Sequence, residues 1–163
     1  MSIRIAEQRD LPELLAIYNH EVLNSVANLD LTPRTLDEWQ VWFDLHNIEN
    51  HPLCVAEIDG RIAGYTSLSS YREKEAFRST VELSIYVAPE FRKRGLASEL
   101  MAYILDMARA DERTHLVISV ISATNEPSIR LHEKLGFTYG GTIPEVGVKF
   151  GVYQDIVNYW LGV

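Results

Sequence analysis

The sequence is poor in the features that mark secreted, membrane-spanning and nucleic-acid-binding proteins. Among its 163 residues there is one cysteine, Cys54, so no internal disulfide can form and a reducing compartment suits the chain. No apolar run has the length that spans a bilayer, and the first residues lack a signal-peptide core. The net charge of −8 disfavours nucleic acid, because neutralising phosphates requires a basic surface. We therefore expect a cytoplasmic protein with no nucleic-acid and no membrane partner.

What the chain does contain is an ordinary globular composition, with 47% hydrophobic and 23% charged residues. This length is sufficient to bury one hydrophobic core, and no linker or internal repeat interrupts it. We predict a single domain over residues 1–163. Cys54 lies in the apolar run 53–56 and is expected to be a small buried hydrophobe.

Hydrophobic patterns predict a mixed α/β fold. The clearest strand covers 80–87, where apolar and polar side chains alternate. Asp59-Gly60 predicts a two-residue hairpin turn, and Asp10 with Glu13 predicts a capping box at the first helix. Gly136 is expected to cap the last helix. The predicted strands are 3–6, 53–58, 61–67, 80–87, 115–122 and 152–161, and the predicted helices follow Asp10 and Pro33 and cover 97–110 and 126–135.

A basic, glycine-containing loop joins the clearest strand to the longest helix. Small residues at positions 95 and 97 allow backbone N–H groups to approach a ligand where the helix begins. These N–H groups, the helix dipole and the flanking cations together favour a small anion such as a diphosphate. A solvated basic turn is the alternative for this segment taken alone. The loop consists of Arg92, Lys93, Arg94, Gly95, Leu96, Ala97 and Ser98.

Two motifs together resemble the GNAT superfamily of N-acetyltransferases. The first is Arg-x-x-Gly-x-Ala after a strand, and the second runs from Asn125 to Phe137 and ends in Lys-Leu-Gly-Phe. The resemblance implies a mostly antiparallel central sheet flanked by helices, and acetyl-CoA as cosubstrate with no metal. It also implies that Asn125 bonds the pantetheine arm or the acetyl region, and that a backbone N–H at or near Val87 receives the thioester carbonyl. The implied cofactor-binding residues are Ile85, Tyr86, Val87, the loop from Arg92 to Ser98, Asn125 and Ser128.

A narrower resemblance covers nearly the whole chain. Residues 80–87 look like the Thr-Val-Glu-His-Ser-Val-Tyr-Val strand of phosphinothricin and methionine sulfoximine acetyltransferases. Residues 131–137 match the same group, which has histidine where many relatives have tyrosine, and residues 145–151 are similar to its Val-Gly-x-Lys-Phe-Gly segment. The expected reaction is transfer of acetyl to the amine of a small amino-acid-like acceptor, by direct attack in a ternary complex.

Two residues are candidates for proton transfer. Glu82 lies on the polar side of the clearest strand and matches the glutamate of the subfamily, so we assign it as the general base. The alternative is a surface carboxylate on a polar sheet face. His132 stands where relatives carry a tyrosine that protonates the leaving thiolate, and an imidazole can do this near neutral pH. It could instead contact the cofactor or be an ordinary helix histidine.

The acceptor half of the chain departs from its relatives. The resemblance places the amino-acid substrate against the basic segment that precedes residue 80, where guanidinium groups suit carboxylate or phosphinate oxygens. A solvated charged loop is the alternative. Leu83 replaces a histidine of the subfamily, and Asn28-Leu29-Asp30 stands where relatives carry an aromatic residue. The predicted substrate-binding residues are Arg72, Glu73, Lys74, Arg78, Glu82, Leu83 and Ser84.

Other functions stay open at this stage. The same cofactor site could serve a protein N-terminus, a lysine or a polyamine as acceptor, and a non-catalytic acyl-CoA sensor would also retain the cofactor loop. By resemblance we expect a homodimer with the acceptor pocket near its interface.

Overall fold

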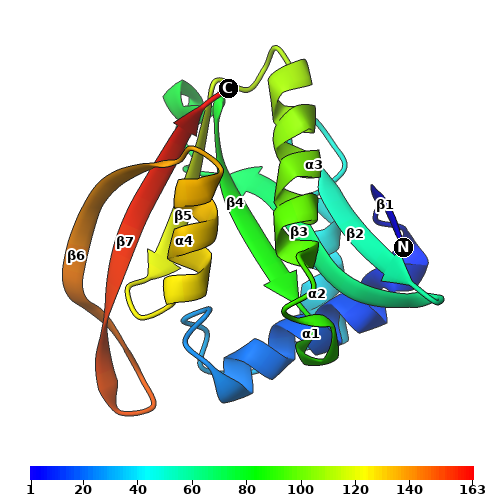
Figure 1. Cartoon of the computed structure of the whole chain (residues 1–163), viewed down its shortest axis with the longest axis horizontal. Coiled ribbons are helices and arrows are strands. Elements are labelled where there is room, and N and C mark those ends of the chain that lie inside the picture. The colour runs from blue at the N-terminus through cyan, green and yellow to red at the C-terminus, as the bar shows by residue number, and fades with distance from the viewer.

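Seven strands form one continuous sheet in the computed structural model, which describes all of residues 1–163 (Figure 1). The strands follow one another across the sheet in the order β1-β2-β3-β4-β5-β7-β6, and β4–β5 is the one parallel pair. The predicted mixed, mostly antiparallel sheet is confirmed. The strands are β1 (Ser2–Ile5), β2 (Leu53–Ile58), β3 (Arg61–Ser70), β4 (Thr80–Val87), β5 (Leu116–Ser122), β6 (Thr138–Lys149) and β7 (Val152–Gly162).

Local turn chemistry explains the hairpin between β2 and β3. Asp59 and Gly60 both have positive φ, 50° and 76°, as a two-residue turn that matches the strand twist requires. The predicted hairpin is therefore confirmed, although β3 continues three residues beyond the predicted end at Ser67.

The sequence prediction missed β6. This edge strand pairs with β7 through two irregularities, one between Tyr139 and Thr142 and one between Ile143 and Gly147. Because each irregularity shifts the side-chain alternation, β6 has no sustained period of two. Nine of its twelve residues are also exposed, so no buried face marks it as a strand.

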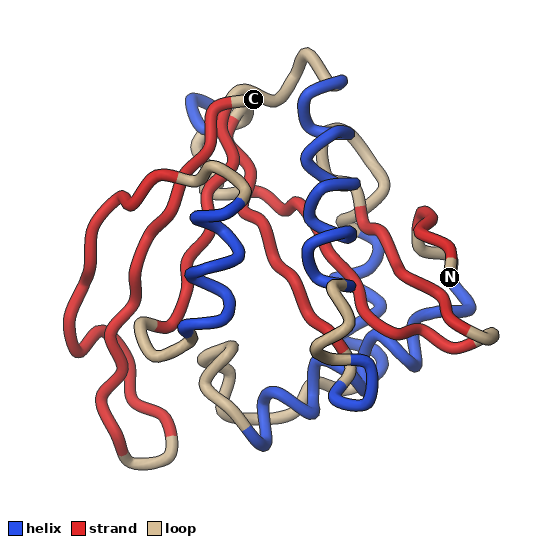
Figure 2. The backbone as a smooth tube through the Cα atoms, in the orientation of Figure 1, coloured by secondary structure: helices blue, strands red, loops and turns tan.

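Four helices cover the sheet, and Figure 1 shows α3 and α4 on the same face. Helix α3 packs Leu100, Met101 and Ile104 in the core, which explains its amphipathic pattern. Helices α1 and α2 contact the sheet through aromatic residues of its other face, and Figure 2 traces the loop between them. The helices are α1 (Leu11–Asn24), α2 (Leu36–Asp44), α3 (Leu96–Ala110) and α4 (Glu126–Lys134), with 3-10 turns at Gln8–Asp10, Glu75–Phe77 and Pro89–Phe91.

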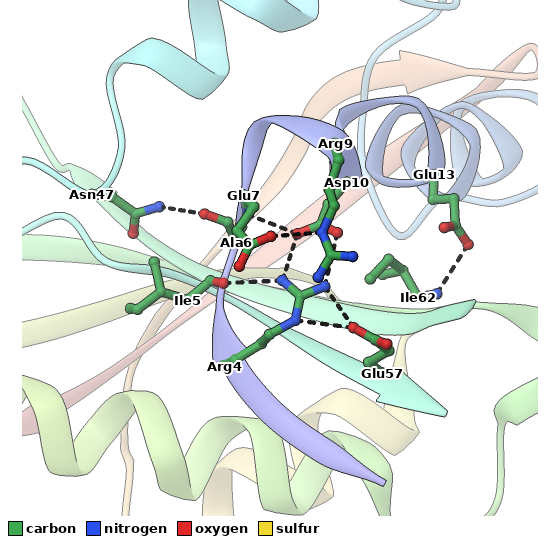
Figure 3. Close-up of polar contacts among 10 residues, drawn as sticks. All are labelled: Arg4, Ile5, Ala6, Glu7, Arg9, Asp10, Glu13, Asn47, Glu57 and Ile62. Atoms are coloured by element: carbon green, nitrogen blue, oxygen red, sulfur yellow. Dashed lines mark hydrogen bonds and ion pairs between the residues drawn. The ribbon is translucent and has the colours of Figure 1, made fainter. Parts of the chain in front are cut away.

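The predicted capping box at the first helix is wrong. The Asp10 carboxylate accepts the Glu7 N–H at 2.7 Å and two hydrogen bonds from the Arg4 guanidinium, at 2.7 and 2.9 Å (Figure 3). Glu13 accepts the backbone N–H of Ile62 on β3 at 2.9 Å instead. Because Arg4 lies outside the four residues that define a capping box, the competing ion pair was not visible in the local pattern.

The core confirms the expectation for the single cysteine. Cys54 is fully buried in the apolar cluster beneath α3, with its sulfur 3.6 Å from that of Met107. Gly136 has a φ of 90° after α4, as its predicted capping role requires. No helix combines the length and the apolar character needed to cross a bilayer.

Candidate active site

The two central strands separate in the middle of the molecule. Parallel pairing joins Thr80–Glu82 of β4 to Leu116–Ile118 of β5 and ends there. Strand β4 stays paired to β3 as far as Val87, so its other edge has no strand partner beyond Glu82. Figures 1 and 2 show β4 and β5 diverging toward the loop that joins α1 to α2.

Two cavities occupy the region where the strands diverge. The first, of about 270 Å³, is lined by Glu82 of β4, by Ser119 and Ser122 of β5 and by His132 of α4. The second, of about 380 Å³, reaches Arg92 and Glu21. Because the two cavities share lining residues, they adjoin one another, and we call the pair, which extends from Glu82 to the Arg92 loop, the central channel. The shared residues are Ala27, Ile85, Tyr86 and Asn125.

Glu82 lies at one end of the central channel. It is half-buried on β4, and burial raises the pKa of its carboxyl group above the usual value. A carboxylate with a raised pKa is a stronger base, so it takes a proton from an ammonium group more readily than an exposed glutamate does. Leu83 and Ser84 line the same cavity.

His132 is held on both sides. Its Nδ1 lies 2.7 Å from the Ser128 carbonyl oxygen, its Nε2 lies 2.8 Å from the Ser119 hydroxyl, and the residue is 1% exposed. Burial lowers the pKa of His132. Because a carbonyl oxygen only accepts, these contacts assign the proton to Nδ1 and leave Nε2 to accept from Ser119. Ser119, which the sequence prediction did not include, therefore fixes the imidazole from the side of β5.

Asn125 and Ser128 sit at the start of α4. The Asn125 side chain accepts the Ser128 N–H at 3.4 Å as the N-cap, and the Ser128 hydroxyl lies 3.4 Å from Nδ1 of His132. The three polar residues predicted to share a helix face are thus adjacent, and all three line the first cavity.

The Arg92 loop enters α3 through two residues with positive φ, Lys93 at 62° and Gly95 at 78°. The first N–H groups of a helix have no acceptor within the helix, so they are available to an anion at this junction. The Arg92 guanidinium is already engaged, since it pairs with the buried Glu21 carboxylate and donates to the Val87 carbonyl at 3.1 Å. Arg94 lies over the Phe91 ring, 5.5 Å from its centroid.

The basic segment before β4 lies apart from both cavities. All four of its predicted substrate residues are exposed, and none lines the central channel. Arg72 stacks over the Tyr71 ring at 5.0 Å, and Arg78 lies 3.7 Å from Glu75. Their substrate-binding role stays a prediction, as do the roles of Glu73 and Lys74.

Lys149 is a site residue that the sequence prediction missed. Its Nζ is buried and donates to the carbonyl oxygens of Asn28 at 2.9 Å and Glu21 at 3.3 Å. Asn28 and Leu29 line the first cavity, so the hydrogen bond from Lys149 to the Asn28 carbonyl oxygen links this wall of the central channel to the end of β6. A lysine inside the apolar run 148–150 was the available signal, because lysine is buried only when its amine is bonded.

A mostly antiparallel sheet whose parallel pair opens beside a basic strand-to-helix loop defines the acyl-CoA N-acyltransferase class of folds. The comparison with protein families agrees, since the model of the Acetyltransferase (GNAT) family matches residues 14–137. The chain belongs to this family.

Individual relatives and solved structures within this family show which acetyltransferases the chain is similar to. The chain is 41% identical over 156 residues to the L-methionine sulfoximine/L-methionine sulfone acetyltransferase of Pseudomonas paraeruginosa, covering 95% of this chain and 90% of that protein. It is similar, at a TM-score of 0.96 and 38% identity with full coverage of both chains, to the ribosomal-protein-alanine N-acetyltransferase of Brucella melitensis. A phosphinothricin acetyltransferase of Sinorhizobium meliloti in complex with acetyl-CoA matches at a TM-score of 0.94 and 30% identity, covering 99% of this chain and 88% of that one.

Proposed function

We propose that the protein transfers the acetyl group of acetyl-CoA to the amine of a small amino-acid-like acceptor of the methionine sulfoximine or phosphinothricin type. The observation that carries the proposal is the half-buried Glu82 carboxylate at one end of the central channel, whose other end is the Arg92 loop. The 41% identity to a methionine sulfoximine/methionine sulfone acetyltransferase supports this acceptor type.

The residues of the central channel suit acetyl-CoA. The unpaired N–H groups at the start of α3, with Lys93 and Arg94 beside them, would hold its diphosphate, and Asn125 would bond the pantetheine arm. When bound, acetyl-CoA supplies a thioester whose carbonyl carbon is the electrophile. The unpaired edge of β4 offers backbone N–H groups, at or near Val87, for the oxygen of that carbonyl.

Glu82 would prepare the acceptor. A free amino acid carries an ammonium group near neutral pH, and only the neutral amine can attack the thioester. Glu82 takes this proton, and binding both reactants in adjoining cavities supplies much of the acceleration through proximity. The attack forms the amide bond and breaks the carbon–sulfur bond, and the thiolate that leaves takes up a proton.

His132 and Ser119 form the proton path that we assign to the thiolate. The neutral imidazole carries its proton on Nδ1, toward Ser128, so it donates to the channel only after Nε2 is protonated. Nε2 would take up the proton that the amine nitrogen releases as the amide bond forms, and the Ser119 hydroxyl would pass its own proton to the thiolate while receiving one from His132. The predicted acid role of His132 thus requires Ser119.

A protein N-terminus is the second candidate acceptor. It is favoured by the high structural similarity to a ribosomal-protein-alanine N-acetyltransferase. The two candidates differ in the group attached to the α-carbon beside the reactive amine, which is a free carboxylate in an amino acid and a peptide carbonyl in a protein.

Assays of thiol release from acetyl-CoA distinguish a free amino acid from a protein N-terminus as the acceptor, and both from a non-catalytic sensor. The acceptors are methionine sulfone, phosphinothricin, spermidine and a short peptide that begins with alanine. We expect turnover with the free amino acids, and its loss in Glu82→Gln while acetyl-CoA affinity is unchanged. Turnover with the peptide alone would favour the second candidate. Acetyl-CoA binding without release for any amine would identify a sensor and overturn the proposal.

We also propose that the protein acts as a cytoplasmic homodimer. Several large apolar side chains at the β6–β7 end of the sheet are exposed, among them Val148 of β6, Phe150 in the turn, and Val152 and Trp160 of β7. Exposed apolar side chains beside an edge strand suit contact with a second copy of the same chain. The single reduced thiol suits the cytoplasm.

A further inference from the structure

A buried carboxylate lies near the end of α1, where local rules disfavour it. Glu21 is 5% exposed and belongs to the last turn of the helix, which ends at Asn24. The partial negative charge of a helix C-terminus repels an anion, and burial removes the water that would solvate it. No basic side chain of the same turn offsets this charge. A residue that breaks local rules in this way points to a tertiary or functional reason.

The counter-ion of Glu21 comes from the cofactor loop. One carboxylate oxygen accepts from the Arg92 guanidinium, and the other accepts from the Ser25 hydroxyl. The Arg92 side chain is 44% exposed and that of Glu21 is 7% exposed, so the carboxylate is the group that depends on the pair. If Arg92 left to bind a diphosphate, it would leave a buried charge unpaired, which is strongly destabilising. The positive charge offered to a diphosphate therefore comes from Lys93 and Arg94.

Arg92 also holds the peptide at the end of β4. Its Nε donates to the Val87 carbonyl oxygen at 3.1 Å. The N–H of the same peptide, that of Ala88, donates to the Ala63 carbonyl oxygen of β3 at 2.9 Å. Since the C=O and N–H of a trans peptide point in opposite directions, the Val87 carbonyl faces the edge of β4 that lacks a strand partner. The Val87 N–H faces the same edge, because both backbone groups of a strand residue point to one side.

These contacts form a series that runs from α1 to the region of the reaction. Glu21 orients the guanidinium of Arg92, and the guanidinium orients the peptide of Val87. All three residues line the second cavity. A guanidinium suits this task, because its rigid planar fork holds two acceptors at fixed angles. A rotation at the end of β4 would turn the Val87 N–H away from a bound carbonyl oxygen, and a hydrogen bond weakens steeply as it bends.

We propose that Glu21 is a positioning residue of acetyl transfer, and that it acts through Arg92 to aim the Val87 N–H at the thioester carbonyl. In this role Arg92 orients the strand and does not bind the diphosphate. The proposal rests on the proposed function, because it presumes a thioester beside β4. It accounts for a buried charge that α1 by itself disfavours.

Two acetyl donors separate positioning from diphosphate binding. Acetyl-CoA carries the diphosphate, and acetyl-pantetheine has the same thioester without it. Glu21→Gln keeps the shape of the side chain and removes its charge, so kcat/KM should fall about ten- to hundredfold with either donor, through kcat. The Kd of coenzyme A should not rise. A loss confined to acetyl-CoA, with a higher Kd for coenzyme A, would overturn the proposal.

Glu90→Gln is the matched control, because it removes an equal charge close to Arg92 in the sequence. Glu90 pairs with Arg61 at the exposed surface and does not line the second cavity. Its variant should keep the wild-type kcat/KM with both donors. A loss in Glu90→Gln as large as that in Glu21→Gln would show a general effect of charge and contradict the proposal.

Arg92→Lys tests the bridge without leaving the buried carboxylate unpaired. A lysine amine can pair with Glu21, but a single ammonium does not reproduce the planar fork that holds Glu21 and the Val87 carbonyl together. We expect thermal unfolding close to that of the wild type and a loss of kcat like that of Glu21→Gln. Wild-type kcat in folded Arg92→Lys would contradict the proposal.

Infrared spectra taken without an acceptor distinguish this proposal from the proposed function. With acetyl-CoA isotopically labelled at its carbonyl carbon, a hydrogen bond from the Val87 N–H lowers the carbonyl stretching frequency. Wild type and Glu90→Gln should show the lowering, and Glu21→Gln and Arg92→Lys should lose most of it. If this holds while no amine is acetylated, the proposed function fails and positioning by Glu21 stands. If the wild type acetylates an amine but the frequency does not depend on Glu21, the proposal fails.

Discussion

At the scale of single residues, Glu82 carries the sharpest prediction. Glu82→Gln keeps the shape of the side chain and removes the base, so kcat/KM should fall about 10²- to 10⁴-fold. In the wild type, kcat/KM should rise with pH through the raised pKa of Glu82, because only the carboxylate accepts a proton. Thiol release measured between pH 5 and 8 checks both points. Full activity in the variant would contradict the base assignment.

The same substitution should stabilise the fold. Burial raises the pKa of Glu82, so the folded state holds that proton to a higher pH than the unfolded state does. Stability contributed by this residue is therefore lost as pH rises from the unfolded pKa through the folded pKa. Urea unfolding of Glu82→Gln should show greater stability than wild type at pH 7.5 and no difference near pH 4. A variant that is weaker at both pH values would contradict this reasoning.

At the scale of elements, Lys149 joins β6 to the loop between α1 and α2. Lys149→Met keeps the length of the side chain but leaves the carbonyls of Glu21 and Asn28 without their donor. We expect a stability loss of about 2 kcal/mol, as for hydrogen bonds to a charged group. Because Asn28 and Leu29 then move more freely, KM should rise more than kcat falls. Chemical unfolding and steady-state kinetics measure the two effects.

Lys134→Met is the matched control for that experiment, because Lys134 is exposed at the end of α4. It should leave stability and KM near the wild-type values. Unchanged KM in Lys149→Met would show that the wall of the central channel does not depend on this amine.

The local sequence pattern was sufficient to predict β4 and α3, the elements that border the central channel. The alternation of 80–87 and the Gly95 helix start depend on neighbours in sequence, and both predictions match β4 and α3. The strand β6 and the partner of Asp10 were missed because each depends on tertiary contacts, an irregular edge pairing and Arg4. The site divides in the same way. Glu82 and His132 were predicted from the motifs, and their roles stay predictions. Lys149 had only its apolar neighbours in the sequence as a signal, and Ser119 is recognised only from its contact with His132 in the folded chain.

At the scale of the whole molecule, the histidines whose pKa is lowered by burial, His46, His51 and His132, reduce stability in weak acid. Burial lowers the pKa values of His46 and His132, which are 5% and 1% exposed. Below about pH 6.5 the unfolded chain binds protons that the folded chain does not, so stability falls as pH falls. The loss should be at most about 1.4 kcal/mol per pH unit for each histidine. Urea unfolding between pH 7.5 and 5.5 measures it.

His46→Gln should reduce that slope, and His20→Gln, on an exposed face of α1, should leave it unchanged. Stability that is flat over this range would contradict the assignment of neutral histidines to the folded state.

The exposed apolar side chains at the β6–β7 end of the sheet make the proposed assembly testable. Val148→Lys with Phe150→Glu places charges among these side chains, at positions that do not line the central channel. We expect light scattering to give a dimer mass for wild type and a monomer mass for the double variant. A wild-type monomer would contradict the proposed homodimer.

The burial of Cys54 also bears on how the enzyme is assayed. It is the one thiol of the chain, it is fully enclosed, and burial raises its pKa to about 12, so the folded protein presents no reactive thiolate to a sulfhydryl dye. Colour that develops in a reaction mixture therefore reports free coenzyme A without a background from the catalyst. When the same dye is added without substrates, the rate of labelling reports the rate of global unfolding. Each molecule is labelled once, and only when unfolding exposes Cys54.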